Sequence, residues 1–196
     1  MPDSDMRVRT ADPDSDAEAI AAIYRPAVEA SAATFEERAP TITQMAARIR
    51  HVLRKTPWLV AEDASDGVIG YAYARLHHER VGYRWSVDVS AYVRPDRHGR
   101  GVGRVMYDAL LPILRRQNFV NVYAGIALPN PASVALHESI GMRRRLRAGR
   151  LQDGRLVRRS LVRHAARRTS RLANRADSVP KASRRVLTLV LPEASC

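Results

Sequence analysis

The sequence predicts an α+β domain in which helices pack on a mixed, mostly antiparallel sheet. Runs rich in β-branched and aromatic residues are typical of strands, and they alternate with segments whose apolar residues recur at helical spacing. The order is strand, helix, helix, three strands, helix, strand, helix, which indicates a layered α+β fold. The chain has 196 residues, of which 45% are hydrophobic. It is therefore long enough for one domain with a core and an appendage.

Each predicted element has a local signal. Thr41 or Thr43 is suited to cap a helix with an apolar stripe. Asp66-Gly67 predicts a tight turn that joins two strands into a hairpin, and Gly141 is suited to end the last helix. The predicted elements are strand 8–10, helices 14–31 and 41–55, strands 58–61, 68–73 and 83–93, helix 99–117, strand 121–126 and helix 131–140.

Charge is distributed unevenly along the chain. Residues 1–141 contain 17 basic and 17 acidic residues, whereas residues 142–196 contain 16 basic and 3 acidic residues, so the formal charge of +13 lies in the second region. The first region gives no electrostatic reason to expect nucleic-acid binding.

The single cysteine, Cys196, excludes a disulfide framework and favours a cytoplasmic location. Neither a signal peptide nor a membrane span is expected, because the chain starts with polar residues and has no long apolar run.

A glycine-rich loop, HGRGVG at 98–103, follows a predicted strand and precedes a predicted helix. Consecutive backbone N–H groups at a helix start attract an anion, and glycines let a phosphate approach the backbone closely. No Gly-Lys-Ser/Thr follows, so the loop is not a P-loop. The strand before it is late in the chain and no βαβ unit is evident, so it is not a dinucleotide fingerprint. The loop predicts a phosphate site without identifying the ligand.

The run VSAYVRPDRHGRGVGRVMYDALL resembles the acetyl-CoA motif of the GNAT N-acetyltransferases. The segments TPWLVAED, VIGYAYA, YRWSVDVSAYV and LPNPASVALHESIGM resemble its phosphinothricin and methionine sulfoximine acetyltransferase branch, between about residues 8 and 142. The resemblance implies the GNAT acyl-CoA N-acyltransferase fold. It also implies acetyl-CoA as the co-substrate and acetyl transfer to the amino group of a small amino-acid-like substrate. The sequence departs from the branch at Arg25, Asp88 and His98, where Asn, Glu, and Gln or Arg are usual.

The resemblance implies a cofactor site on the glycine loop and on the end of the strand before it. In the family, the pyrophosphate lies on the loop and the pantetheine arm lies along the strand end. Arginines of the loop would add charge for the phosphates, or simply form a solvated helix start. An asparagine before the last helix would hold the pantetheine, make an Asx turn, or do both. The implied cofactor residues are Tyr92, Val93, Arg97, His98, Gly99, Arg100, Gly101, Val102, Gly103, Asn130 and Ser133, with further charge from Arg104.

Two residues are implied in the chemistry. Asp88 occupies the position of a carboxylate that takes a proton from the substrate ammonium, directly or through a water. A pair with Arg84 is the alternative. His137 lies on the helix where relatives offer an acid that protonates the leaving thiolate of CoA, and a half-buried structural histidine is the alternative. No metal site is expected.

The resemblance implies substrate contacts from two regions. Arg80 matches an arginine that binds the carboxylate of the amino acid, and Tyr83 and Trp85 would surround its side chain unless they pack in the core. Phe35 and Glu36 match a loop that covers the substrate. Relatives are homodimers with the pocket near the subunit interface, so a small-molecule amine and a second copy are the expected partners. Neither a membrane nor a nucleic acid is expected.

The basic region after Gly141 departs from the branch. The branch continues with two strands that carry a signature like Val-Gly-Phe-Lys-x-Gly-x-Trp-x-Asp-Val, whereas no aromatic residue follows Tyr123 here. If arginine and leucine codons are CGN and CTN, reading them one base later permits Val-Gly-Phe-Lys-Met-Gly-Ala-Trp-Tyr-Asp-Val, in register. The sequence therefore predicts a one-base frameshift near residues 143–145. It predicts an acetyltransferase domain over 1–145 and an aberrant, poorly ordered region over 146–196, with the last two strands missing or aberrant and activity impaired.

Two further interpretations of the chain stay open. The basic region would be a working nucleic-acid or ribosome-binding arm, although it lacks the aromatic residues expected for single-strand binding. Alternatively, the chain would be a non-catalytic regulator that binds acetyl-CoA. A salt-dependent shift with DNA would support the first, and stabilisation by acetyl-CoA without turnover would support the second.

Overall fold

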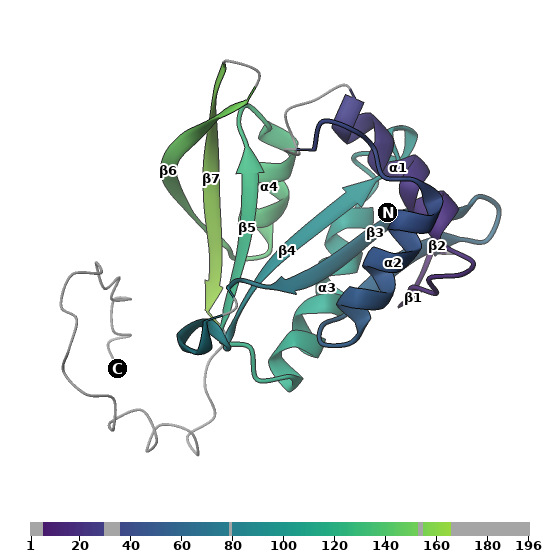
Figure 1. Ribbon diagram of the computed structural model, residues 1–196, viewed down its shortest axis with the longest axis horizontal. Coiled ribbons are helices and arrows are strands. Elements are labelled where there is room, and N and C mark those ends of the chain that lie inside the picture. The colour runs from purple at the N-terminus through teal and green to yellow at the C-terminus, as the bar shows by residue number, and fades with distance from the viewer. Residues whose placement is uncertain (1–5, 30–35, 79, 153–154, 166–196) are drawn as a thin grey trace. The chain divides into compact units, whose positions relative to one another are not determined.

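The computed structural model describes residues 6–29, 36–78, 80–152 and 155–165 (Figure 1). These residues belong to one compact unit, Met1–Ala166. The elements in chain order are β1 (Met6–Thr10), α1 (Ala17–Glu29), α2 (Ile42–Leu53), β2 (Trp58–Asp63), β3 (Gly67–Leu76), a short 3-10 helix (Val81–Tyr83), β4 (Ser86–Val93), a second 3-10 helix (Pro95–Arg97), α3 (Val102–Arg116), β5 (Asn121–Ala127), α4 (Pro131–Ser139), β6 (Arg143–Gln152) and β7 (Arg155–Ala165).

The strands form one mixed sheet in the order β1-β2-β3-β4-β5-β7-β6. β4 and β5 run parallel, and each other pair of neighbouring strands is antiparallel. The parallel pair is joined through α3, as a parallel crossover requires. The predicted mixed, mostly antiparallel sheet with flanking helices is therefore confirmed. Within the described ranges, no helix is both long and apolar enough to cross a membrane.

Two apolar cores lie on opposite faces of the sheet, and β3 shows why. Its tyrosines, Tyr71 and Tyr73, belong to the core beneath α1 and α2, whereas its alanines, Ala72 and Ala74, belong to the core beneath α3. This is the period-two alternation of a strand buried on both faces. Figure 1 shows α1 and α2 on one side of the sheet and α3 on the other.

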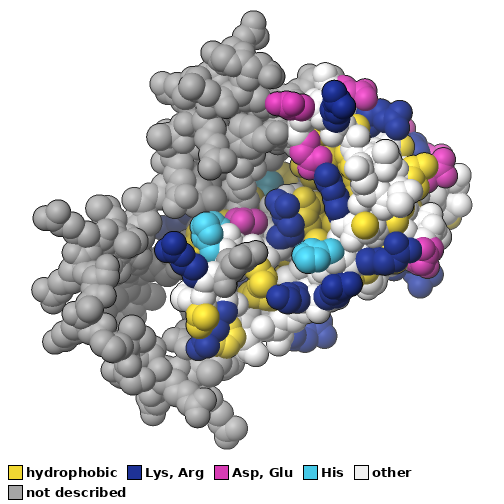
Figure 2. Space-filling model, in the orientation of Figure 1, with side chains coloured by type: hydrophobic (Ala, Val, Ile, Leu, Met, Phe, Trp, Pro, Cys, Tyr) yellow, Lys and Arg dark blue, Asp and Glu magenta, His cyan; other side chains and the backbone are white. Residues whose placement is uncertain are grey.

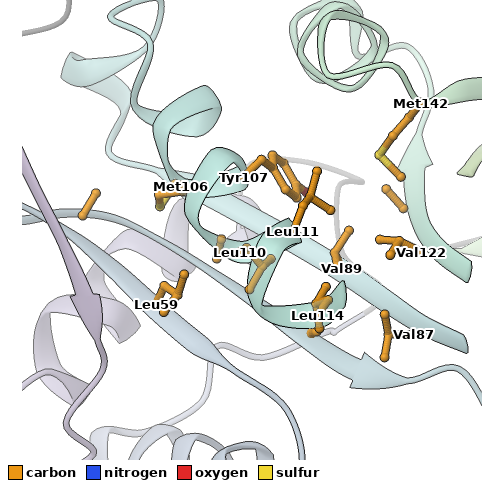
Figure 3. Packing of buried hydrophobic residues seen from close by; sticks show 14 of the residues in the cluster. Leu59, Val87, Val89, Met106, Tyr107, Leu110, Leu111, Leu114, Val122 and Met142 are labelled. Atoms are coloured by element: carbon orange, nitrogen blue, oxygen red, sulfur yellow. The ribbon is translucent and has the colours of Figure 1, made fainter. Parts of the chain in front are cut away.

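α3 packs on the sheet through an apolar stripe at helical spacing. Met106, Leu110 and Leu114 are fully buried, and Figure 3 shows them along α3 in the core cluster that also contains Leu59, Val87 and Val122 of the sheet. The spacing of four residues keeps these side chains on one face of the helix. Burying each such side chain contributes about 1.5–3 kcal/mol relative to an exposed one, so this stripe holds the start of α3 in place beside the sheet.

The structure contains the predicted cap of α2 and the predicted end of α4. Thr41 caps α2: its hydroxyl accepts from the backbone N–H of Gln44, whose side chain accepts from the N–H of Thr41, a complete capping box. Gly141 follows α4 with a φ of 81°, as predicted for the end of that helix. Residues 81–83 form a 3-10 helix, so the strand predicted from residue 83 begins only at Ser86.

Two strands lie where the sequence predicts missing or aberrant ones. β6 and β7 pair with each other, and β7 pairs along the whole of β5. The predicted boundary after residue 145 therefore falls inside β6. A sheet edge exposes backbone groups that any chain segment free of proline can pair with, and residues 143–165 contain no proline. The part of the predicted aberrant region at 166–196 lies outside the described residues.

Candidate functional site

A cavity opens where β4 and β5 separate. The two strands pair only at residues 86–88 and 121–123, and they diverge beyond that point (Figure 1). In paired parallel strands, the backbone N–H and C=O groups that face each other form hydrogen bonds between the strands. Where β4 and β5 separate, these groups on the strand edge are open to a ligand. The cavity has a volume of about 640 Å³, and the diverging ends of both strands, the start of α3 and the first turns of α4 line it.

The glycine loop leads into an uncapped helix N-terminus at this cavity. Gly101 precedes α3 with a left-handed φ of 82°, and no side chain caps the helix. Its first intrahelical hydrogen bond runs from the N–H of Val105 to the carbonyl of Gly101. The N–H groups of the preceding turn, together with the positive end of the helix dipole, therefore favour an anion at this place.

Gly103 allows α3 to lie close to α4. A Cβ atom at this position would meet Cδ2 of Leu136 at 2.8 Å. Both residues line the cavity, so the glycine also sets the width of its wall. Of the predicted cofactor residues, all described, each lies in the cavity lining except Arg100.

Three basic side chains in or next to the glycine loop already have protein partners. Arg97 forms ion pairs with Asp66 and Asp63, and Arg104 pairs with Asp108 one turn along α3. His98 donates from Nε2 to the carbonyl of Val93, 2.9 Å away, which ties the loop to the end of β4. Figure 2 shows basic, acidic and hydrophobic side chains interspersed on one face. A role of these side chains with phosphates stays a prediction.

The predicted acid, His137, is a buried partner of Tyr107. Its Nδ1 lies 2.6 Å from the carbonyl of Ser133 and therefore carries the proton, so its Nε2 accepts from the Tyr107 hydroxyl at 2.9 Å. Burial lowers the pKa of His137 and raises the pKa of Tyr107, so both side chains are neutral at pH 7. The geometry supports the structural alternative for His137, and its acid role stays a prediction.

Asn130 caps α4. Its side-chain oxygen accepts from the backbone N–H of Ser133 at 3.0 Å, which is the Asx-type turn that the sequence offers as one alternative. Both residues line the cavity. The contact with a pantetheine arm stays a prediction.

Tyr92 lines the cavity and also packs against the core beneath α1 and α2. Its ring is edge-on to Tyr24 at 5.0 Å and stacked on Tyr71 at 5.2 Å. Burial raises the pKa of the Tyr92 hydroxyl. The aromatic neighbours thus fix the ring of this cavity-lining residue.

The predicted base, Asp88, lies at the last pair between β4 and β5, opposite Tyr123. Its Oδ1 is 2.8 Å from Nδ1 of His77. Arg84, the alternative partner, instead stacks over the Trp85 ring at 4.9 Å. Residues 89 and 90, which follow Asp88, line the cavity, whereas Asp88 itself precedes the lining residues of β4.

Of the predicted substrate residues, the structure places some near Asp88 and others elsewhere. Tyr83 and Trp85 are 41% and 38% exposed, which excludes the core-packing alternative. The Tyr83 ring lies 5.8 Å from His77, and therefore near Asp88, whereas Arg80 lies on the surface at the start of a 3-10 helix. Glu36 pairs with Arg48 and accepts from Tyr24. Phe35 lies outside the described residues.

His77 and Tyr107 are site residues that the sequence did not predict. His77 follows β3, whose register pairs Arg75 with Asp88. That register places His77 diagonally across from Asp88 on the same face of the sheet. The sequence shows a histidine just after a predicted strand. It does not show the register between β3 and β4, which brings that histidine to Asp88. Among the described residues, no cluster of three or more potential metal ligands occurs.

Comparisons with known proteins agree with this geometry. The model of the acetyltransferase (GNAT) domain matches residues 9–150. Over 131 residues, the chain is 39% identical to the phosphinothricin N-acetyltransferase of Alcaligenes faecalis, a match that spans 65% of this chain and 66% of that enzyme. It is 36% identical over 138 residues to the L-methionine sulfoximine/L-methionine sulfone acetyltransferase of Salmonella typhimurium, which covers 69% of this chain and 79% of that enzyme.

A solved structure shares the fold. The phosphinothricin acetyltransferase of Sinorhizobium meliloti in complex with acetyl-CoA superposes with a TM-score of 0.77 at 30% identity, covering 82% of this chain and 88% of that chain. The family match covers well over half of the sequence and includes both the diverging strands and the glycine loop. The chain belongs to the GNAT acetyltransferase family.

Proposed function

We propose that the chain binds acetyl-CoA in the cavity between β4 and β5 and transfers the acetyl group to the amino group of a small amino-acid-like substrate. The observation that carries this proposal is the cavity itself, which joins an open strand edge to an uncapped helix N-terminus. An anion suits the helix end, and an amide-containing arm suits the strand edge. The pyrophosphate and pantetheine of acetyl-CoA have these two properties.

The acceptor class is supported by the relatives and by the residues beside Asp88. Phosphinothricin and the methionine derivatives that the relatives are named for are amino acids, so an ammonium has to lose a proton before it attacks. The carboxylate of Asp88, one residue before the cavity lining of β4, would take part in this step. The exposed ring of Tyr83 near it offers an apolar contact for a side chain. The cytoplasmic location and the homodimer stay predictions.

Acetyl-CoA binding is the first test of this proposal. The midpoint of thermal unfolding of the full chain should rise with acetyl-CoA, because a ligand at a hundredfold excess over its Kd stabilises the folded state by about 2.7 kcal/mol. A matched series with AMP, which lacks the pantetheine, should shift the midpoint less. Equal shifts with both compounds, or no shift with either, would contradict the assignment of the cavity.

The composition after residue 142 leads to a second part of the proposal. We propose that the basic region arises from a one-base frameshift near residues 143–145. The support is the excess of 16 basic over 3 acidic residues there, together with the fit of the shifted codons to the branch signature. Backbone pairing continues through β6 and β7, because a sheet edge pairs through the main chain. The side chains that the strands present would nevertheless differ from those of the branch.

A further inference from the structure

His77 and Asp88 form a hydrogen-bonded pair at the point where β4 and β5 separate. Nδ1 of His77 is 2.8 Å from Oδ1 of Asp88. An ionised carboxylate only accepts hydrogen bonds, so Nδ1 carries the proton of a neutral ring and donates it. The lone pair of that ring is then on Nε2. The pair thus consists of one acceptor nitrogen and one carboxylate that fixes its tautomer.

A backbone hydrogen bond and neighbouring rings hold the imidazole of His77 in place, and its side chain stays partly exposed to solvent. The backbone N–H of His77 donates to the carbonyl of Ser86 at 3.0 Å, which extends the pairing of β3 with β4 past Leu76. The rings of Tyr123, His78 and Tyr83 lie 4.6, 4.9 and 5.8 Å from the His77 ring. The side chain of His77 is 14% exposed and that of Asp88 is 36% exposed. The pair is ordered by its contacts and still reachable by a small molecule.

A histidine with this partner presents one oriented acceptor nitrogen, Nε2, because Nδ1 is held by the carboxylate. Histidine is the side chain that most often serves as a general base. A proton on Nε2 would leave an imidazolium beside a carboxylate, an ion pair that the short contact stabilises. A proton on a lone carboxylate would leave only a neutral acid.

We infer that His77 and Asp88 act together as the base of the acetyl transfer, an inference that rests on the proposed function. Nε2 of His77 takes a proton from the substrate ammonium, directly or through one water, while Asp88 holds the ring. The amine lone pair then forms a C–N bond to the acetyl carbon. The C–S bond breaks with its electron pair leaving on sulfur, and the second amine proton passes to that thiolate. The products are the amide, free CoA and one proton on His77.

Substitution of both members of the pair is the direct test. His77→Gln and Asp88→Asn should each lower kcat by about 100-fold or more, because neither an amide nor an unoriented ring serves as this base. The KM for acetyl-CoA should change little. The double variant should lose no more than the worse single variant, since members of one catalytic unit are strongly non-additive. His51→Gln, an exposed histidine of α2, is the matched control and should keep full activity.

Chemical rescue separates a base from a merely structural residue. Added imidazole should restore part of the kcat of His77→Ala in proportion to its concentration, and it should leave Asp88→Asn unchanged. If the unaltered chain turns over but His77→Gln stays within about threefold of it, or if the two losses multiply in the double variant, the inference fails while the proposed function stands.

A spectroscopic measurement tests the pair even in a chain without turnover. Nitrogen-15 NMR of the histidine rings should show His77 as the Nδ1–H tautomer when neutral, and Asp88→Ala should abolish that preference. An Nε2–H tautomer in the unaltered chain would overturn the inference by itself. Failure to bind acetyl-CoA would instead count against the proposed function.

Discussion

The hydroxyl of Tyr107 and the ring of His137 link α3 to α4 at the wall of the cavity. Both side chains are buried, and the carbonyl of Ser133 completes the set of hydrogen bonds. A buried polar group without a partner costs more than a hydrogen bond contributes. The pair therefore matters most for the stability of this wall.

Tyr107→Phe should lower the free energy of unfolding by about 1–3 kcal/mol, because it leaves Nε2 of His137 buried without a donor. Urea denaturation of the full chain measures the change. Tyr83→Phe is the control, because Tyr83 is 41% exposed, and it should stay within about 0.5 kcal/mol of the unaltered protein. Equal effects of the two changes would contradict the buried hydrogen bond.

His137 should make stability fall on acidification. Burial lowers its pKa in the folded state, so the unfolded chain binds more protons once the pH drops below the ordinary histidine value of about 6.5. The contribution is complete above that value and is lost progressively toward the lower folded pKa. Unfolding free energies measured from pH 8 to pH 5 should decline more steeply for the unaltered chain than for His137→Gln. Parallel curves would contradict a buried neutral ring.

At the scale of elements, the start of α3 determines what the cavity can bind. Gly101 adopts a left-handed φ of 82° and leaves the helix without a side-chain cap, while the stripe of apolar residues on α3 fixes the position of the helix. The backbone donors are therefore held in place before any ligand arrives. Preorganised donors of this kind favour an anion without a cost of rearrangement.

Gly101→Ala should lower the free energy of unfolding by about 1–2 kcal/mol, the cost of a left-handed backbone for a residue with a Cβ. It should also weaken acetyl-CoA binding in isothermal titration, because the loop has to shift. Gly82→Ala is the matched control, since that glycine has no positive φ and open space around its Cβ position. An unchanged Kd in Gly101→Ala would argue against phosphate binding at this helix start.

The sequence predicts the elements better than it predicts their contacts. The capping box at Thr41 and the turn before β3 are local features, so their signals lie within a few residues of each other. The pairing of His77 with Asp88 depends instead on the register between two strands, which no local signal specifies. The exposure of Tyr83 and Trp85 likewise depends on a 3-10 helix in place of the expected strand. The glycine loop at the start of α3 could be predicted as an anion site, because the residues that form it are adjacent in the sequence.

At the scale of the whole molecule, the cavity and the pair of His77 and Asp88 lie next to each other where β4 and β5 separate. The cavity begins at residues 89 and 124, and the pair of His77 and Asp88 lies at the preceding step of the sheet. A ligand in the cavity and an amine beside Asp88 would therefore be neighbours. The parallel pair in an otherwise antiparallel sheet is what creates this meeting point.

The frameshift proposal makes a prediction about the gene. Read one base later from near residue 143, its codons should encode a Val-Gly-Phe-Lys-x-Gly-x-Trp-x-Asp-Val segment in place of residues 149–159. Sequencing the gene with independent reads checks this directly. Codons that spell no aromatic residue in the shifted frame would contradict the proposal and would make the basic region a native part of the protein.

The most direct test of the central claim is release of CoA thiol from acetyl-CoA in the presence of phosphinothricin, methionine sulfoximine or methionine sulfone. The assay should be run on this chain and on a frame-corrected version, with each acceptor omitted in turn. We expect thiol release that requires an acceptor, with higher kcat in the frame-corrected chain. Absence of acceptor-dependent release from both chains with all three amines would contradict the proposed transfer to this class of substrate.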